Sequence, residues 1–346
     1  MKTAKPTAYT PDALIKGKLP EKVMSAYLRR MTMTGLERRY AIAAEKHRKM
    51  ALAVASAELE VIALVDATSD FLLALECRRV AAKLEMPSTP GWGITAGSVV
   101  CYALGISDLD PLAFGLATPE CPGLLLGPGR VRTHVALPIC DYICREFQGA
   151  LIQHFQHNQF TAVCETETAD AQFSTKAATK CLECRVGGET PQVFVPMRDL
   201  SIQRNMLRIL PKTGKIAPKL AEIPLDDPAT YTAMVRGDNS DLPFLGRPGM
   251  QTLLDTMVPG NIAKLTDAVE RYLSDISTRY SVLRALFESE PEAPVRTSPD
   301  CYLDGRGARA LVQAVIAYRT AYLKAHFPDE FAVVVTSMAQ VSIVPF

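Results

Sequence analysis

The spacing of apolar residues predicts a chain made mainly of helices. From residue 21 to residue 83 the apolar positions recur near a 3.6-residue period, which indicates amphipathic helices that cover a core. The positions that set this period at its start are Tyr27, Leu28, Met31 and Leu36. A short apolar helix is expected over 99–104 and a longer helix over 145–158.

Proline and glycine mark the ends of these helices. Pro87 and Pro90 end the first helical region, and residues 117–130 are rich in both residue types and are expected to form a loop. A Glu- and Pro-rich stretch, 287–300, is expected to be a solvated linker. Residues 1–20, rich in Pro, Lys and Thr, are expected to be a loosely held lead-in.

Three glycines, Gly91, Gly93 and Gly97, come just before the helix expected over 99–104. Glycines at a helix N-terminus let the backbone approach a phosphate closely, and the unpaired N–H groups of the first turn point at it. The alternative is a loop that only connects and caps the helix. On the pattern alone we favour this alternative, because a lone glycine-rich turn is a weak signal.

The composition is that of an ordinary globular protein. The 346 residues are 48% hydrophobic and 22% charged, which is enough for two or three domains with their own cores. The 38 Lys and Arg against 37 Asp and Glu leave a net charge of +1, so a strongly basic nucleic-acid binder is not indicated. We find no run of about 18 apolar residues and no signal-peptide pattern, so we expect a cytoplasmic protein without a membrane span and with nine reduced cysteines.

Two pairs of residues have the spacing of metal ligands. His154 and His157 lie three residues apart on one face of the expected helix, and Cys181 and Cys184 form a Cys-x-x-Cys pair. A zinc site needs four ligands, and neither pair has a further ligand fixed nearby. We therefore expect solvated surface histidines and no zinc at the cysteine pair; the family resemblance given below implies that the cysteines are ordinary residues of a helix over 172–187.

Three blocks of the sequence resemble the bacterial replicative DNA polymerase alpha subunit, the C family or DNA polymerase III. They are PGWGITAGSVVCYALGISDLDP at 90–111, a block from IPLDD to GM at 223–250, and IAYRTAYLKAHFPDEF at 316–331. The blocks keep the family's order, and weaker similarity extends from Tyr27 to Gln340. The resemblance implies a shortened, divergent copy with two internal deletions.

The resemblance implies a helix-rich α+β fold with a small mixed-sheet palm of the nucleotidyltransferase type, a helical thumb remnant and helical fingers. The implied regions are a flexible lead-in at 1–20, a palm-like region at 21–150, a thumb-like remnant at 151–190, a return to the palm at 191–222 and a shortened fingers-like region at 223–346.

The resemblance also implies two Mg²⁺ ions held by aspartates on one face of a strand, where they activate the primer 3′-hydroxyl. Placing Pro138 on the family's proline puts Ile139, Asp141 and Ile143 on the aspartate positions, so only Asp141 is kept. Asp199 is the third catalytic aspartate if residues 193–207 match one family segment, and a strand-end residue if they match another. Asp141 and Asp199 are thus the candidate catalytic residues and Mg²⁺ ligands.

The nucleotide contacts implied by the resemblance are Gly93, Gly97, Ser98, Arg306 and Arg309. Two family side chains that bind triphosphate, an Arg and a Ser, are replaced by Trp and Ile at positions 92 and 94. The family's Lys-Ser-His motif is also lost, but Arg306 and Arg309 keep positive charge near its place for phosphate or DNA backbone. The alternative for these two arginines is a solvated first turn of a helix.

Two hypotheses about function follow. The first is a DNA-directed DNA polymerase, a nucleotidyltransferase of DNA replication that uses a DNA primer–template, dNTPs and Mg²⁺. The second is a non-catalytic relative that binds DNA or replisome subunits, or a decayed gene copy. The changes fall together on the aspartate strand, the triphosphate side chains and the Lys-Ser-His motif, while the apolar helices persist, which favours impaired or lost activity.

Overall fold

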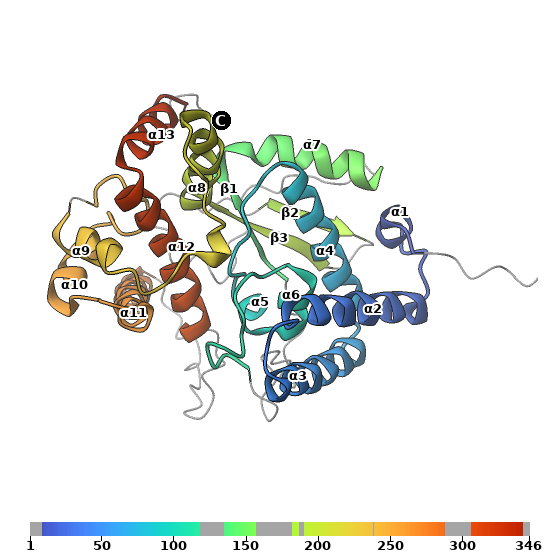
Figure 1. Cartoon of the computed structure of the whole chain (residues 1–346). Helices are drawn as coiled ribbons and strands as arrows, with labels where there is room; N and C mark the ends of the chain where they lie inside the picture. Colours follow the sequence, from blue (N-terminus) through green and yellow to red (C-terminus); the bar gives the residue numbers. More distant parts are fainter. Residues whose placement is uncertain are drawn as a thin grey trace, which may run out of the picture. The chain divides into compact units, whose positions relative to one another are not determined.

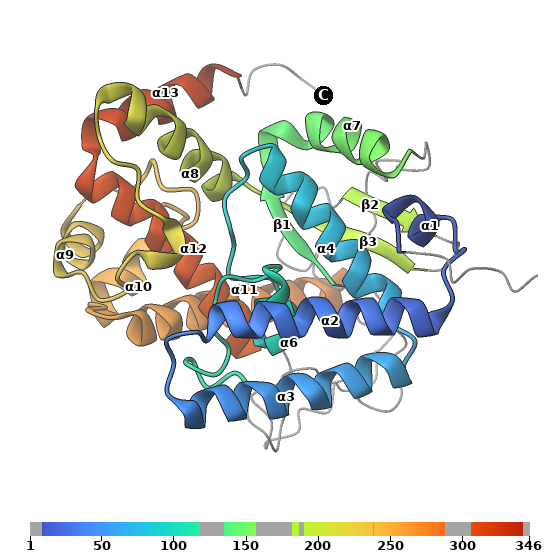
Figure 2. The ribbon, with the colours of Figure 1, turned by 45° about the vertical axis from the view of Figure 1, so that its right-hand side comes forward.

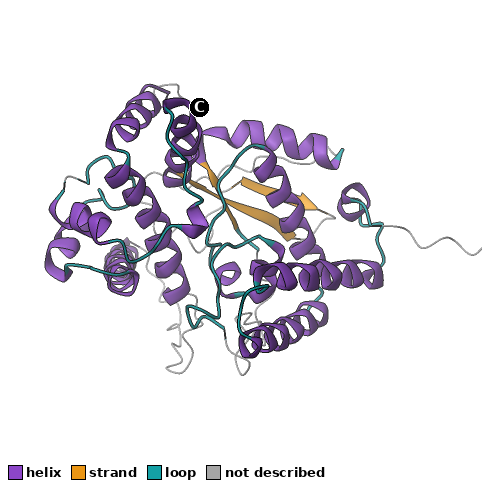
Figure 3. Ribbon diagram, viewed as in Figure 1, coloured by secondary structure: helices purple, strands orange, loops and turns teal. Residues whose placement is uncertain are grey.

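The computed structural model describes residues 9–117, 135–156, 182–186, 190–237, 239–287 and 306–341. Helices dominate this part of the chain, and its strands form one small sheet (Figures 1 and 3). The helix-rich α+β class is therefore confirmed, whereas the nucleotidyltransferase-type palm and the palm-, thumb- and fingers-like regions stay predictions. None of the described helices is long and apolar enough to cross a membrane.

The described residues form two compact units. The first contains the residues up to 156 together with 182–186 and 190–196, and the second contains those from 197 onward.

The first unit is built from seven helices around the sheet. The helices are α1 (Pro11–Ile15), α2 (Glu21–Arg39), α3 (Glu45–Leu64), α4 (Thr68–Lys83), α5 (Ile94–Gly97), α6 (Val99–Leu104) and α7 (Cys144–Phe155). The helical region expected over 21–83 is confirmed as three helices, and the helix expected over 99–104 is confirmed as α6. The helix expected over 145–158 is confirmed as far as Phe155.

The sheet has the strand order β1-β3-β2, with β1 at Leu137–Cys140, β2 at Leu182–Val186 and β3 at Thr190–Met197. Strands β2 and β3 are antiparallel, and Leu182 pairs with Phe194. The helix expected over 172–187 is thus wrong at 182–186, while 172–181, with Cys181, lie outside the described residues. Leu182, Cys184 and Val186 alternate with charged residues, which is the period of a strand.

The lead-in is ordered in its described part. Leu14, Ile15 and Leu19 are buried, and α1 packs against α4 and α7. The side chain of Thr10 caps α1 by accepting a hydrogen bond from the Ala13 N–H at 3.2 Å. The expectation of a loose lead-in is therefore wrong for residues 9–20, because a few apolar side chains anchor a segment of otherwise polar composition.

The second unit is organised around one helix. Its helices are α8 (Arg198–Ile209), α9 (Pro228–Arg236), α10 (Met250–Met257), α11 (Ile262–Phe287), α12 (Arg306–His326) and α13 (Pro328–Val341). Helix α12 packs against α8, α9, α11 and α13, and every residue from 310 to 318 is buried. A helix that is apolar on all sides belongs in a core, which explains this central place. At the start of the expected linker, residue 287 still belongs to α11; residues 288–300 lie outside the described part.

Helices α2 and α6 pack against each other (Figure 2). Their backbones approach closely at Gly35. A Cβ atom at this position would lie 2.0 Å from the carbonyl oxygen of Ala103. Only glycine lets two backbones meet at this distance.

We expect Gly35→Ala to destabilise the protein by roughly 1–3 kcal/mol, because the added methyl forces the two helices apart. Gly149→Ala is the matched control, since a Cβ at Gly149 in α7 meets nothing within 4 Å. The control should be neutral or stabilising by about 0.5–1 kcal/mol through helix propensity. Urea unfolding measures both, and equal effects of the two substitutions would contradict the close approach.

Candidate functional site

The glycine-rich turn before α6 is closed by its own hydrogen bonds. The N–H of Trp92 donates to Thr95 Oγ1 at 2.6 Å, and this hydroxyl donates to the Trp92 carbonyl at 3.0 Å. Gly91 and Gly93 both have positive φ, +87° and +57°, and a Cβ on Gly91 would lie 2.7 Å from Thr95 Oγ1. The glycines therefore serve a tight turn that folds onto the Thr95 side chain.

The N-terminus of α6 is capped from within the protein. Ser98 is the N-cap residue, and its hydroxyl accepts from the Cys101 N–H at 3.0 Å. Glu58 of α3 supplies the other acceptor: Oε1 accepts from the Val99 N–H at 3.0 Å. Oε2 of the same carboxylate accepts from the Val100 N–H at 2.9 Å and from Ser98 Oγ at 2.7 Å.

This carboxylate fills the place where a bound anion would lie. Glu58 and Ser98 are both completely buried, and the N-terminus of a helix favours a negative group. Burial raises the pKa of Glu58 from 4.5 to about 7, against three hydrogen bonds that lower it. Ser98 thus has the capping role that the pattern alone favoured, and contact of Gly93, Gly97 and Ser98 with a triphosphate stays a prediction.

We expect Glu58→Gln to destabilise the protein by about 1–3 kcal/mol near pH 5, because an amide NH₂ group cannot accept from the N–H groups that point at it. Since the folded pKa lies above 4.5, the wild-type contribution is full below pH 4.5 and falls as the pH rises through 7. The deficit of the variant should therefore fall by about 2–3 kcal/mol between pH 5 and pH 8, so that at pH 8 the variant is as stable as the wild type or more stable.

Urea unfolding at several pH values measures this deficit. Glu60→Gln is the control, since Glu60 is exposed on the same helix and should change stability by less than about 0.5 kcal/mol. A deficit that grows with pH would contradict the assignment.

The structure places Asp141 just beyond the strand expected to carry it. Strand β1 ends at Cys140, and Asp141 begins a short 3₁₀ turn that ends at Ile143. The alternation of Ile139, Asp141 and Ile143 on one strand face is therefore wrong beyond residue 140. Both isoleucines are buried and Asp141 is half-buried.

Asp199 lies in the second unit, as the second residue of α8, so it follows the end of β3 rather than ending the strand. It is 4% exposed. Within the described residues, no group of three or more His, Cys, Asp or Glu is gathered to hold a metal ion. The roles of Asp141 and Asp199 as Mg²⁺ ligands stay predictions.

Arg306 and Arg309 lie in the first turn of α12. The side chain of Arg309 is half-buried, so it is not a fully solvated residue, and the side chain of Arg306 lies outside the described part. Their contact with nucleotide or DNA also stays a prediction.

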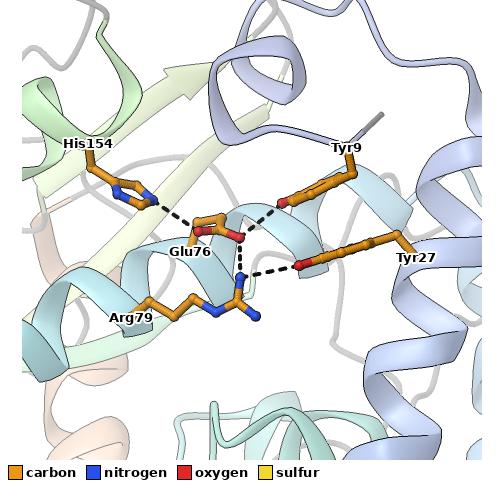
Figure 4. Close-up of polar contacts among 5 residues, drawn as sticks. All are labelled: Tyr9, Tyr27, Glu76, Arg79 and His154. Carbon is orange, nitrogen blue, oxygen red and sulfur yellow. Dashed lines mark hydrogen bonds and ion pairs between the residues drawn. The ribbon is translucent and has the colours of Figure 1, made fainter. Parts of the chain in front are cut away.

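A second buried carboxylate, Glu76 of α4, holds a polar cluster together (Figure 4). Its side chain is 2% exposed, and Oε1 accepts from Arg79 at 2.6 Å and from the Tyr9 hydroxyl at 3.2 Å. Oε2 lies 2.9 Å from Nε2 of His154 on α7. Glu76 therefore ties the N-terminal segment and α7 to α4.

Aromatic stacking supports the same cluster. The rings of Tyr9 and Tyr27 are parallel with centroids 3.7 Å apart, and Arg79 donates to the Tyr27 hydroxyl at 3.4 Å. Burial and the neighbouring Glu76 raise the pKa of Tyr9, so its hydroxyl stays a donor. The expectation of a solvated His154 is wrong, because its side chain is 19% exposed and paired with Glu76; His157 lies outside the described residues.

We expect Glu76→Gln to cost about 1–3 kcal/mol, because the amide loses charge-assisted bonds to Arg79 and His154. Tyr9→Phe keeps the stack and removes one hydrogen bond, so it should cost about 1 kcal/mol or less. Thermal and urea unfolding rank the two variants. A larger loss for Tyr9→Phe would show that Glu76 does not organise the cluster.

The described cysteines are free thiols. This holds for the cysteines whose side chains are described, Cys77, Cys101, Cys140 and Cys144, of which the first three are buried. Burial raises the pKa of Cys144 to about 11, so this thiol is protonated at neutral pH.

Known proteins match the part of the chain that holds the glycine turn and the α6 cap. Residues 26–121 match the family described as the bacterial DNA polymerase III alpha NTPase domain. Over these residues the chain is similar to the DNA polymerase III alpha subunit. The match contains Glu58 and Ser98 and ends before Asp141.

Individual relatives give the same result over short stretches. The DNA polymerase III alpha subunit of Aquifex aeolicus is 35% identical over 139 residues, which is 40% of this chain and 11% of the relative. Those of Treponema pallidum and Escherichia coli K12 are 38% and 37% identical over 90 and 98 residues, covering 26% and 28% of this chain and 7% and 8% of the relative. The chain spans about a tenth or less of the length of these curated relatives.

Neither buried carboxylate was predicted from the sequence. Glu58 lies in ALAVASAELEVIAL and Glu76 in FLLALEC, each at a position where its apolar neighbours are buried. An acid on the apolar face of a helix needs a partner, so this pattern was the available signal. The partners come from distant segments, which a periodicity argument does not reach.

Proposed function

We propose that this chain is a DNA-binding relative of the DNA polymerase III alpha subunit that does not extend primers. The observation that carries the proposal is the internal pairing at the turn and cap before α6. The Trp92 N–H is taken by Thr95, and the Val99 and Val100 N–H groups are taken by Glu58. A triphosphate would have to displace a buried carboxylate to reach these donors.

The metal side of the proposal rests on the residues at the end of β1. Two-metal phosphoryl transfer needs carboxylates that bridge the ions. Here the residues two positions before and after Asp141 are isoleucines, Ile139 and Ile143. Both isoleucines belong to the buried core. If Mg²⁺ binds, Asp141 is the residue of this turn that would contact it.

The binding side of the proposal rests on the relatives and on the packing. The matched relatives are DNA polymerase subunits, and helices α2 to α6 of the matched region keep buried cores. A relative that keeps DNA binding but loses catalysis is expected to keep the packing of its fold while its catalytic residues change. DNA or replisome subunits are the proposed partners.

Primer extension tests the proposal directly. With a primer–template, dNTPs and Mg²⁺ or Mn²⁺, we expect no extension above background and no difference between the wild-type chain and Asp141→Ala. Fluorescence anisotropy on the same DNA should show binding that weakens as salt rises, with a dissociation constant of roughly 10⁻⁴–10⁻⁶ M at physiological salt.

Extension that Asp141→Ala abolishes would overturn the non-catalytic part of the proposal. Binding that is absent at low salt would overturn the DNA-binding part. A competent polymerase on the same primer–template serves as the positive control for the assay.

A further inference from the structure

Exposed cations surround the short connection between α2 and α3. We call Arg38, Lys46, Arg48 and Lys49 the basic corner. Arg38 is in the last turn of α2 and the other three are at the start of α3, and all four are exposed. Figure 2 shows that the end of α2 and the start of α3 are joined at the same end of this helix pair.

The basic corner has a local excess of positive charge, although the whole chain is nearly neutral. Residues 38–49 contain five Lys or Arg and one acid, Glu45, whereas the complete chain has a net charge of +1. Glu45 pairs with Lys49 at 2.8 Å. Arg39 is turned inward, where it lies over the Tyr102 ring and reaches the Ser107 carbonyl. Arg38, Lys46 and Arg48 therefore carry the outward charge of the corner.

The cations at the start of α3 oppose helix stability. The first turn of a helix is its positive end and favours acids, yet Lys46 and Arg48 lie there. The N-cap residue is Ala44, which makes no side-chain cap hydrogen bond. Residues that lower the stability of their own helix are expected where they take part in binding.

We propose that the basic corner binds the phosphate backbone of DNA. This inference rests on the proposed function, to which it adds the binding surface. Lys and Arg that meet phosphates hold DNA without regard to base sequence. Tyr40, which lies between these cations in the sequence, is buried. The basic corner therefore presents charge and not the exposed aromatic side chain that is typical of a protein–protein hot spot.

The test is a triple substitution in the full chain, Arg38→Gln, Lys46→Gln and Arg48→Gln. Binding to a primer–template duplex is measured by fluorescence anisotropy from 50 to 200 mM salt. Each lost phosphate contact lowers the slope of log K against log salt by about 0.9, so we expect the slope to fall by roughly 2–3. Two unrelated DNA sequences of equal length should give the same affinity.

A matched control removes the same charge elsewhere in the first unit. Lys18, Lys22 and Lys83 are exposed, and their triple change to Gln should leave the slope within about 1 of the parent. Arg38→Lys with Arg48→Lys keeps the charge and should keep the slope. The corner triple should melt close to the parent temperature, since the loss of Lys46 and Arg48 from the positive end of α3 offsets the loss of Arg38 from the negative end of α2.

The outcomes separate this inference from the proposed function. If the parent chain shows no salt-dependent binding, both are overturned. If the parent binds and the corner triple binds with an unchanged slope, the corner is not the surface and the proposed function stands. If the control triple loses as much slope as the corner triple, binding follows net charge and the corner is again excluded.

Discussion

Glu58 brings a buried carboxylate from α3 to the N-terminus of α6, where two backbone N–H groups and the Ser98 hydroxyl point at it. Helix α6 has only six residues and would not be stable alone, so its position depends on this carboxylate and on its contact with α2 at Gly35. Helices α2, α3 and α6 are thereby fixed to one another. The glycine-rich turn, which ends at α6, takes its place from the same interaction.

A helix N-terminus can receive either an external anion or an internal one. Here the carboxylate of Glu58 is completely buried and accepts from the first N–H groups of α6, where the helix dipole favours a negative group. Its pKa is raised to about 7, because burial disfavours the charged form of Glu58 by more than the three hydrogen bonds favour it. The carboxylate is therefore kept in place by packing rather than by strong solvation. A carboxylate with these properties supports the fold as the internal cap of α6.

Local patterns predicted the fold well where the information is local. The helical limits at 21, 83, 99 and 104 follow from periodicity and from the prolines and glycines beside them. The pairs Glu58–Ser98 and Glu76–His154 join residues 40 and 78 positions apart, and no single-sequence pattern encodes such contacts. Strand β2 was missed because the family resemblance was preferred to a period-two alternation, and α1 because few apolar anchors are hidden in a polar segment.

The net charge of the sequence did not predict the charge of the exposed surface, because it does not distinguish buried from exposed side chains. Glu58 and Glu76 are buried and satisfied by donors inside the first unit, so their negative charge is not displayed to solvent. Arg38, Lys46 and Arg48 are exposed, and of the two exposed acids beside them in the sequence, Glu37 and Glu45, the second is paired with Lys49. A chain that is nearly neutral by composition can therefore present a cationic face. What a polyanion meets is the arrangement of charges within a Debye length, about 8–10 Å at physiological salt, and not their sum over the chain.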